Sequence, residues 1–186
     1  MRANRLLAIG LLICAALLLG QNGWLHAKAW LAGQLIEAAW ARTLQGDDAV
    51  RPWPWADTWP VARLTLPGGR HHIVLHDASG QSLAFGPGLL PGSTPAGTPG
   101  TLAIAGHQDT VFRALENISM DDLLHIQRRS GDMLAYRVTR IDIVDSRTQM
   151  AVLSPASDTL MLVTCYPFGA PAGTPWRYVI HAQRDI

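Results

Sequence analysis

The sequence predicts an all-β domain, either a barrel or a sandwich, behind an N-terminal helical segment. After residue 60 it breaks into short β-branched or alternating runs, separated by clusters rich in Gly, Pro and Ser. Short strands with turn signals between them are typical of both architectures. The 186 residues, with 17 Gly and 12 Pro, allow one such domain plus a leader.

Six strands and several connections follow from this pattern. The expected strands are Val61–Leu66, His71–Asp77, Thr101–His107, Met133–Asp145, Thr159–Cys165 and Arg177–Gln183. Turn clusters are expected at 67–69 and 78–81 and over the long stretch 86–100. The segments Asp109–Leu115 and Met120–Leu124 are expected to form short helical turns.

Residues 1–27 form a targeting segment. Arg2 and Arg5 precede the uncharged apolar run Leu6–Gly20, a pattern that predicts a cytoplasmic N-terminus and an exported remainder. Two interpretations remain open: an uncleaved membrane anchor that ends near Leu25, or a signal peptide cut after Ala27. The anchor is favoured because Leu25 and Ala27 make a poor small-residue cleavage site.

Residues 28–60 connect this leader to the domain, which spans 61–186. Lys28–Gln45 has helical character and is stopped by Gly46, Asp47 and Asp48, so we expect a stalk helix. The prolines of Arg51–Pro60 forbid regular helix, and its three tryptophans are expected to pack on the domain as an arm.

Charge and cysteine content narrow the function. The net charge is +1 and no long basic run is present, which argues against a nucleic-acid partner. Of the two cysteines, Cys14 lies inside the apolar run, so Cys165 stands alone in the exported domain. An odd cysteine in an oxidising compartment is an intermolecular disulfide partner, a reactive thiol or an inert buried side chain.

Three residues favour the reactive thiol. His107 and Cys165 each end an apolar strand, and Arg177 begins the strand after Cys165. If these last two strands pair in antiparallel fashion, Cys165 and Arg177 lie at the same rim. A thiolate nucleophile, an imidazole for proton transfer and a guanidinium for an oxyanion are the groups that acyl transfer requires.

These motifs resemble the sortase family. Its Thr-Leu-x-Thr-Cys strand end is similar to Met161–Cys165, which departs only at the first Thr, and its glycine-histidine pair matches Gly106-His107. Its arginine begins the strand after the cysteine loop, as Arg177 does. The tryptophan-rich arm and Phe85–Gly88 are similar to the sortase class of Gram-negative bacteria.

The resemblance implies a closed, roughly eight-stranded barrel with short helices behind a membrane helix. It implies a cysteine transpeptidase with Cys165 as nucleophile, His107 as acid/base and Arg177 as oxyanion partner. We expect no cofactor and no metal site, although some sortases bind calcium. The substrate would be an exported protein with an LPXTG-like C-terminal sorting signal, transferred through a thioacyl enzyme to an amine. Ser146–Asp158 would wall the substrate groove. The enzyme would sit in the inner membrane with a single span and face the periplasm.

Other polar residues have weaker functional interpretations. Asp109 either orients His107 or begins a helix. His72 and His76 share a strand face but lie roughly 13 Å apart, too far for one ion, so these two and His71 are interpreted as surface or rim residues. His125 and His181 are expected to be structural or solvated. Asp121, Asp122 and Glu116 lack a calcium-loop pattern and are interpreted as a solvated turn.

Three rival functions remain. An L,D-transpeptidase would need a Ser-x-Gly-Cys-x-Arg pattern, which is missing around Cys165. A papain-like or cell-wall peptidase would place its cysteine at the start of a helix, whereas a strand precedes Cys165. A non-catalytic periplasmic adaptor that binds a partner's tail would have no reason for a reactive thiol, so thiol labelling separates it from the enzymes.

Overall fold

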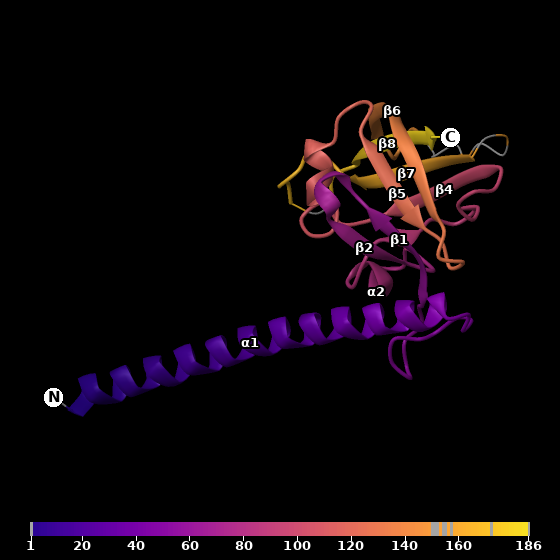
Figure 1. The fold of residues 1–186 in the computed structure, drawn as a ribbon. Helices are drawn as coiled ribbons and strands as arrows, with labels where there is room; N and C mark the ends of the chain where they lie inside the picture. The colour runs from indigo at the N-terminus through magenta and orange to yellow at the C-terminus, as the bar shows by residue number, and fades with distance from the viewer. Residues whose placement is uncertain (1, 150–152, 154–155, 157, 172, 186) are drawn as a thin grey trace.

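The structure is a computed structural model that describes residues 2–149, 153, 156, 158–171 and 173–185. Within the first helix, side chains are described for residues 21, 23, 24 and 26–44. A small barrel sits beside the C-terminal half of a long helix, whose N-terminal half extends away from the barrel (Figure 1).

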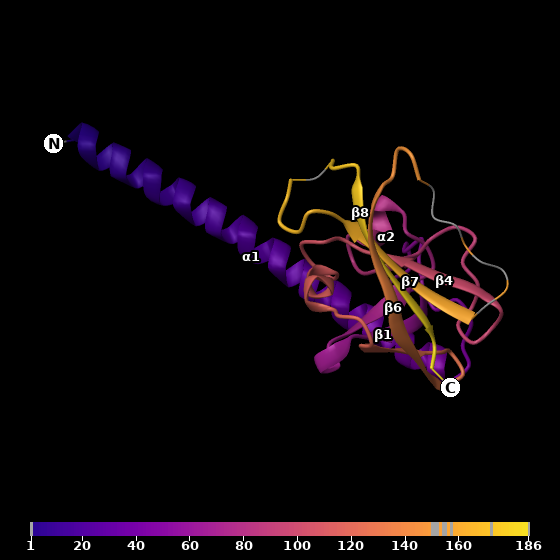
Figure 2. The same ribbon diagram turned by 90° about the horizontal axis from the view of Figure 1, so that it is seen from above.

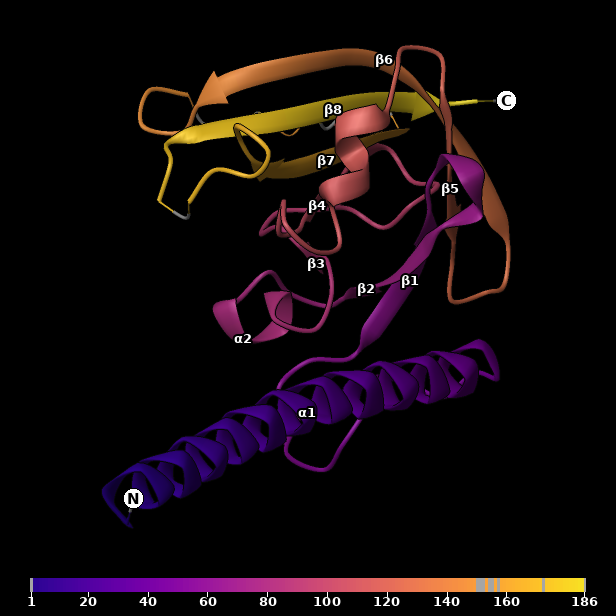
Figure 3. The ribbon, with the colours of Figure 1, turned by 90° about the vertical axis from the view of Figure 1, so that its left-hand side faces the viewer.

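Eight strands of the described residues close into a barrel in the order β1-β2-β3-β4-β7-β8-β6-β5. The predicted barrel is thus confirmed and the sandwich alternative is wrong. Figure 3 shows β6 and β8 on the side of the barrel away from α1. The strands are β1 (Pro60–Thr65), β2 (His71–Leu75), β3 (Gly88–Leu89), β4 (Gly100–Ala105), β5 (Leu123–Gln127), β6 (Met133–Asp145), β7 (Asp158–Cys165) and β8 (Trp176–Arg184).

All six predicted strands are present, with ends shifted by at most two residues. The expected helical turn at Met120–Leu124 is wrong, because Leu123 already begins β5, which pairs with β6 from Leu123↔Arg137 to Gln127↔Met133. The other expected turn becomes the 3₁₀ helix η2 (Arg113–Asn117), and a short α2 (Gly80–Leu83) replaces the turn at 78–81. A further 3₁₀ helix, η1 (Pro67–Gly69), connects β1 to β2.

The barrel interior is filled by alternate residues of its strands, as a period of two requires. Its core includes Leu64, Leu102, Ile104, Leu160, Leu162 and Ile180. In β4 and β7 the other set of residues faces outward. Ala103 and Met161 belong to a separate apolar cluster on this outer face, together with Val179 of β8.

The helix α1 runs without a break from Arg2 to Leu44. The helix therefore continues through the expected boundary between leader and stalk at residue 27. Gln21, Asn22 and Gly23 do not interrupt it, because each of these residue types lowers helix stability by only about 1 kcal/mol or less. In the part of α1 whose side chains are described, no segment is long and apolar enough to cross a membrane.

The C-terminal half of α1 packs on β1 and β2. Ile36 and the fully buried Trp40 contact Ile73 and Leu75, and Glu37 accepts a hydrogen bond of 2.8 Å from Arg63. This half of the helix is thus part of the folded domain.

The arm 51–60 packs as expected, with one exception. Trp53 meets Phe85 edge to face at 5.0 Å, and Trp59 stacks on His76 at 3.8 Å. Trp55 remains 78% exposed.

Candidate active site

Sheet pairing brings the three predicted site residues into one row. β7 and β8 pair in antiparallel fashion with Cys165 directly opposite Arg177, which confirms the arrangement expected from the sequence. β4 and β7 are parallel, with Ala105 level with Val163. The same register two residues further places His107 level with Cys165. Neighbouring strands lie about 4.8 Å apart, so Cys165 stands between His107 and Arg177.

Alternation sets the face on which the row lies. Leu160, Leu162 and the buried Thr164 point into the barrel, so Cys165 lies with Met161 and Val163 on the outer face. On β8 the interior residue Ile180 fixes Arg177 and Val179 on that same outer face. Cys165 is half-buried, while His107 is exposed just beyond the end of β4.

Gly106 and Thr164 extend the β4–β7 pairing up to the row. The Gly106 N–H donates to the Val163 carbonyl at 3.1 Å, and the Thr164 hydroxyl donates to the Gly106 carbonyl at 2.7 Å. Gly106 also lies against the ring of Phe112, where a Cβ would come within 2.7 Å of Phe112 Cδ2. A glycine is therefore required for the chain to turn His107 outward over the core.

Arg177 is held by its own loop. Its Nη1 donates to the Thr174 carbonyl at 2.6 Å and to the Trp176 carbonyl at 2.9 Å. Among the described residues, no carboxylate lies within ion-pairing distance of Arg177. The guanidinium therefore retains N–H donors for a ligand, unlike the paired rim charge that a purely structural role would predict.

Gln108, which sequence analysis did not single out, links the two sides of the site. It is only 7% exposed, and its Nε2 donates to the Ala170 carbonyl in the β7–β8 loop at 2.8 Å. Its Oε1 is buried without a hydrogen-bond partner among the described residues. Gln108 thereby fixes the segment next to His107 against the loop that connects Cys165 to Arg177.

Asp109 is exposed, and among the described residues no hydrogen bond joins it to His107. It does not begin a helix either, because η2 starts at Arg113 after Phe112, whose N–H donates to the His107 carbonyl at 2.9 Å. Neither role expected for Asp109 is therefore seen.

A cavity of about 630 Å³ runs along the outer face beside Arg177. Met161, Val163 and Val179 form its apolar floor, and Ser146 and Gln149 line it from the β6–β7 connection. This segment was expected to wall a groove, although 150–152, 154, 155 and 157 fall outside the described residues. Leu153 packs on the same apolar cluster.

The far end of this cavity is polar. His181 lies 3.1 Å from an Asp142 carboxylate oxygen that also pairs with Arg140 at 2.8 Å. Burial, followed by the nearby Arg140, lowers the pKa of His181, although Asp142 opposes this effect. The cavity thus offers apolar surface next to the row and charge at its other end.

Comparison with known proteins agrees with this geometry. The family model of the sortase domain matches residues 64–185, which contain the whole barrel after the first residues of β1. The chain belongs to the sortase family. The matched range includes His107, Cys165 and Arg177.

Individual relatives show the extent of the likeness. This sortase is 34% identical over 86 residues to sortase D of Bacillus subtilis (strain 168), covering 46% of this chain and 43% of that protein. The sortase A structure from Corynebacterium diphtheriae superposes with a TM-score of 0.62 at 28% identity, covering 71% of this chain and 63% of that one. Sortase C-1 from Actinomyces oris gives 0.58 at 25% identity, over 68% and 75% of the two chains. The chain therefore spans less than two thirds of sortase D and of this sortase A.

Proposed function

We propose that this sortase is a cysteine transpeptidase that cleaves an LPXTG-like C-terminal sorting signal and joins the protein to an amine. The observation that supports this most directly is the row of His107, Cys165 and Arg177 on one outer face. Each side chain of the row matches one requirement of acyl transfer.

The first half-reaction forms a thioacyl enzyme. The Cys165 thiolate attacks the Thr–Gly carbonyl carbon, and the carbonyl oxygen takes up the negative charge. Free N–H groups of Arg177 donate to this oxyanion, in a place that its loop contacts have already fixed. His107, protonated at this stage, gives its proton to the leaving amine as the C–N bond breaks.

The second half-reaction reverses the proton transfer. Neutral His107 takes a proton from the incoming amine, whose nitrogen attacks the thioacyl carbon. A new amide forms and Cys165 leaves as the thiolate. The apolar cavity floor beside Arg177 suits the extended sorting signal, with Ser146 and Gln149 at its wall.

The decisive experiment is a search for the thioacyl adduct. The full-length protein is incubated with a sorting-signal peptide and its mass is measured, first without an amine and then with one added. A Cys165 adduct that an amine converts to an amide product supports transpeptidation. If Cys165 neither acylates nor reacts with thiol reagents, the chain is a non-catalytic adaptor.

We also propose that residues 1–27 are an uncleaved anchor in an inner membrane, with the barrel in the periplasm, as in the sortase class of Gram-negative bacteria. Arg2 and Arg5 before an uncharged apolar run support this orientation. C-terminal fusions to a periplasm-dependent and a cytoplasm-dependent reporter, expressed in a Gram-negative host, test it. Activity of the cytoplasmic reporter alone would rule it out.

A further inference from the structure

An apolar stripe follows one side of α1 before the helix reaches the barrel. Trp24, Lys28, Leu31 and Leu35 are spaced by four, three and four residues, which places them on one face of the helix. Trp24 is 63% exposed and Leu31 is 50% exposed. The Lys28 ammonium lies 5.5 Å from the centre of the Trp24 ring.

The arm and the end of α2 extend this stripe. Leu31 and Leu35 share an apolar cavity of about 750 Å³ with Trp53, Trp55 and Phe85. Trp55 is 78% exposed and Phe85 is 44% exposed, so large apolar side chains from three separate segments meet at one surface. We call Trp24, Leu31, Trp55 and Phe85 the apolar collar.

The position of the collar along the chain indicates what covers it. The same helix continues toward the N-terminus into the uncharged run Leu6–Gly20. With a rise of about 1.5 Å per residue, Leu31 lies roughly 6 Å beyond Ala27, the last residue of the proposed anchor. The headgroup layer of one leaflet is roughly 5–8 Å thick. Tryptophan beside lysine is also the composition typical of a membrane interface.

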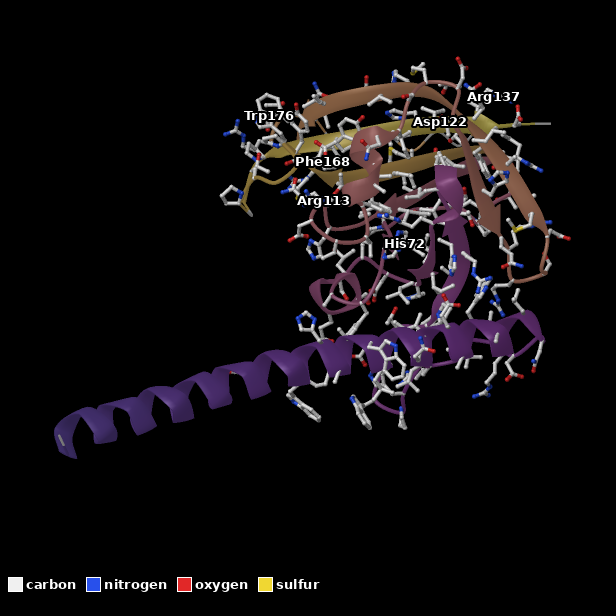
Figure 4. The ribbon with its side chains drawn as sticks, turned by 60° about the vertical axis from the view of Figure 1, so that its left-hand side comes forward. His72, Arg113, Asp122, Arg137, Phe168 and Trp176 are labelled. Atoms are coloured by element: carbon white, nitrogen blue, oxygen red, sulfur yellow. The ribbon has the colours of Figure 1, made fainter. Side chains whose placement is uncertain are left out.

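The catalytic rim lies on the side of the barrel toward which α1 extends. The N-terminal half of α1 leaves the barrel on the side where the β7–β8 loop lies, as Figures 1 and 2 agree. Figure 4 places Phe168 of this loop and Trp176, the first residue of β8, on that side, whereas Arg137 lies at the opposite end of the barrel.

We propose that the apolar collar lies in the headgroup layer of a phospholipid bilayer, so that the catalytic rim faces the membrane. This inference rests on the proposed anchoring by residues 1–27.

Fluorescence quenching tests the contact without reference to activity. The full chain is reconstituted in phosphatidylcholine vesicles whose acyl chains are brominated near the headgroup. Lipid-dependent quenching of the tryptophan fluorescence should be weaker in the Trp55→Phe variant, which lacks one exposed indole ring of the collar. The quenching should equal that of the parent in Trp59→Phe, the control in the same arm, because the Trp59 ring stacks on His76. Unchanged quenching in Trp55→Phe would overturn the proposal, as would a partner protein or second copy that shields Trp55 from the lipid.

A turnover measurement tests the orientation. Phe85→Ser and Trp55→Ser should leave turnover of a soluble signal peptide unchanged, because neither residue contacts the row. Turnover of the same peptide tethered to vesicle lipid should fall several-fold. If turnover of the tethered peptide does not fall, the proposed orientation is wrong. If lipid quenches Trp55 but the protein transfers no peptide, the membrane contact is supported and the transpeptidase function is rejected.

Discussion

Cys165 and Arg177 face each other directly across the β7–β8 pairing, although eleven residues of loop and strand separate them along the chain. Their relative position is therefore set by strand register and not by the conformation of the loop. The parallel register of β4 and β7 adds His107 to the same row. Each of the three can be removed without touching the barrel interior, which makes the proposed roles separable from folding.

Replacing Cys165 with alanine should abolish both cleavage and transfer, because the sequence has no other cysteine in the domain 61–186. The variant should keep the melting temperature of the parent within a few degrees, since the side chain lies on the outer face. Mass spectrometry of the peptide products measures the reaction. Persistent amide product in Cys165→Ala would reject the nucleophile.

His107→Ala should reduce turnover by about 10²–10⁴-fold, the usual contribution of a positioned acid/base. The matched control is His71→Ala, whose ring is exposed on β2 and whose neighbour is Glu37 at 3.5 Å. A control that loses as much turnover as His107→Ala would show that the assignment of the acid/base is wrong.

Arg177→Lys keeps the charge but loses the planar set of donors. An oxyanion donor should lose roughly 10²–10³-fold in turnover, with little change in melting temperature. Arg137→Lys is the control, because Arg137 lies at the opposite end of the barrel (Figure 4) and pairs with Asp185 at 2.9 Å. Near-normal turnover of Arg177→Lys would leave only a Cys165–His107 pair in the mechanism.

Gln108→Leu should lower turnover through the position of His107 rather than through lost chemistry. The change removes the 2.8 Å hydrogen bond to Ala170 and should cost about 1 kcal/mol of stability. If Gln108 positions the site, the pH profile of turnover should shift, whereas a merely less stable protein would keep the profile of the parent. Gln108→Glu, which retains an acceptor but not the donor, should behave like the leucine variant at neutral pH.

His72 should make stability depend on pH. Burial, then Arg70 and His71, lowers the pKa of His72 in the folded protein below its ordinary value of about 6.5. The unfolded chain therefore binds the proton more readily, and the free energy of unfolding should fall as the pH drops through about 6.5. Denaturant titrations between pH 8 and pH 5, at roughly one-unit steps, measure this. His72→Gln should flatten the dependence, and His71→Gln should flatten it less, because His71 is the smallest of the three causes. A slope unchanged in His72→Gln would contradict the assignment.

Sequence patterns predicted the parts of this fold that repeat along a strand. The alternation in Thr159–Cys165 was enough to identify the strand and to place the thiol at its end. β3 was missed because its two residues, Gly88 and Leu89, lie in a stretch rich in Gly and Pro. β5 was missed because its start, next to Asp121 and Asp122, was taken for a helical turn. Pairing with β6, which local sequence does not reveal, makes this segment a strand.

The candidate site likewise has parts that the sequence could predict and parts that it could not. His107, Cys165 and Arg177 could be predicted because strand ends are visible in the sequence, and the structure places all three in one row. The Gln108–Ala170 contact could not, because it joins two irregular loops 62 residues apart and depends on how both pack. The uninterrupted α1 was likewise missed, since local composition suggested two segments where packing on β2 stabilises one end of a single helix.

The hydrogen bond from Thr164 to Gly106 also protects the protein against a slip of β7 by one residue. Such a slip would exchange the two faces of the strand. The thiol of Cys165 would then point into the barrel, while Leu160 and Leu162 would be expelled into water. Insertions or deletions inside β7 should therefore abolish the proposed activity even when a barrel still forms, whereas length changes in the β6–β7 connection should leave the position of Cys165 unchanged. The outward position of the thiol thus depends on the same apolar residues that build the core.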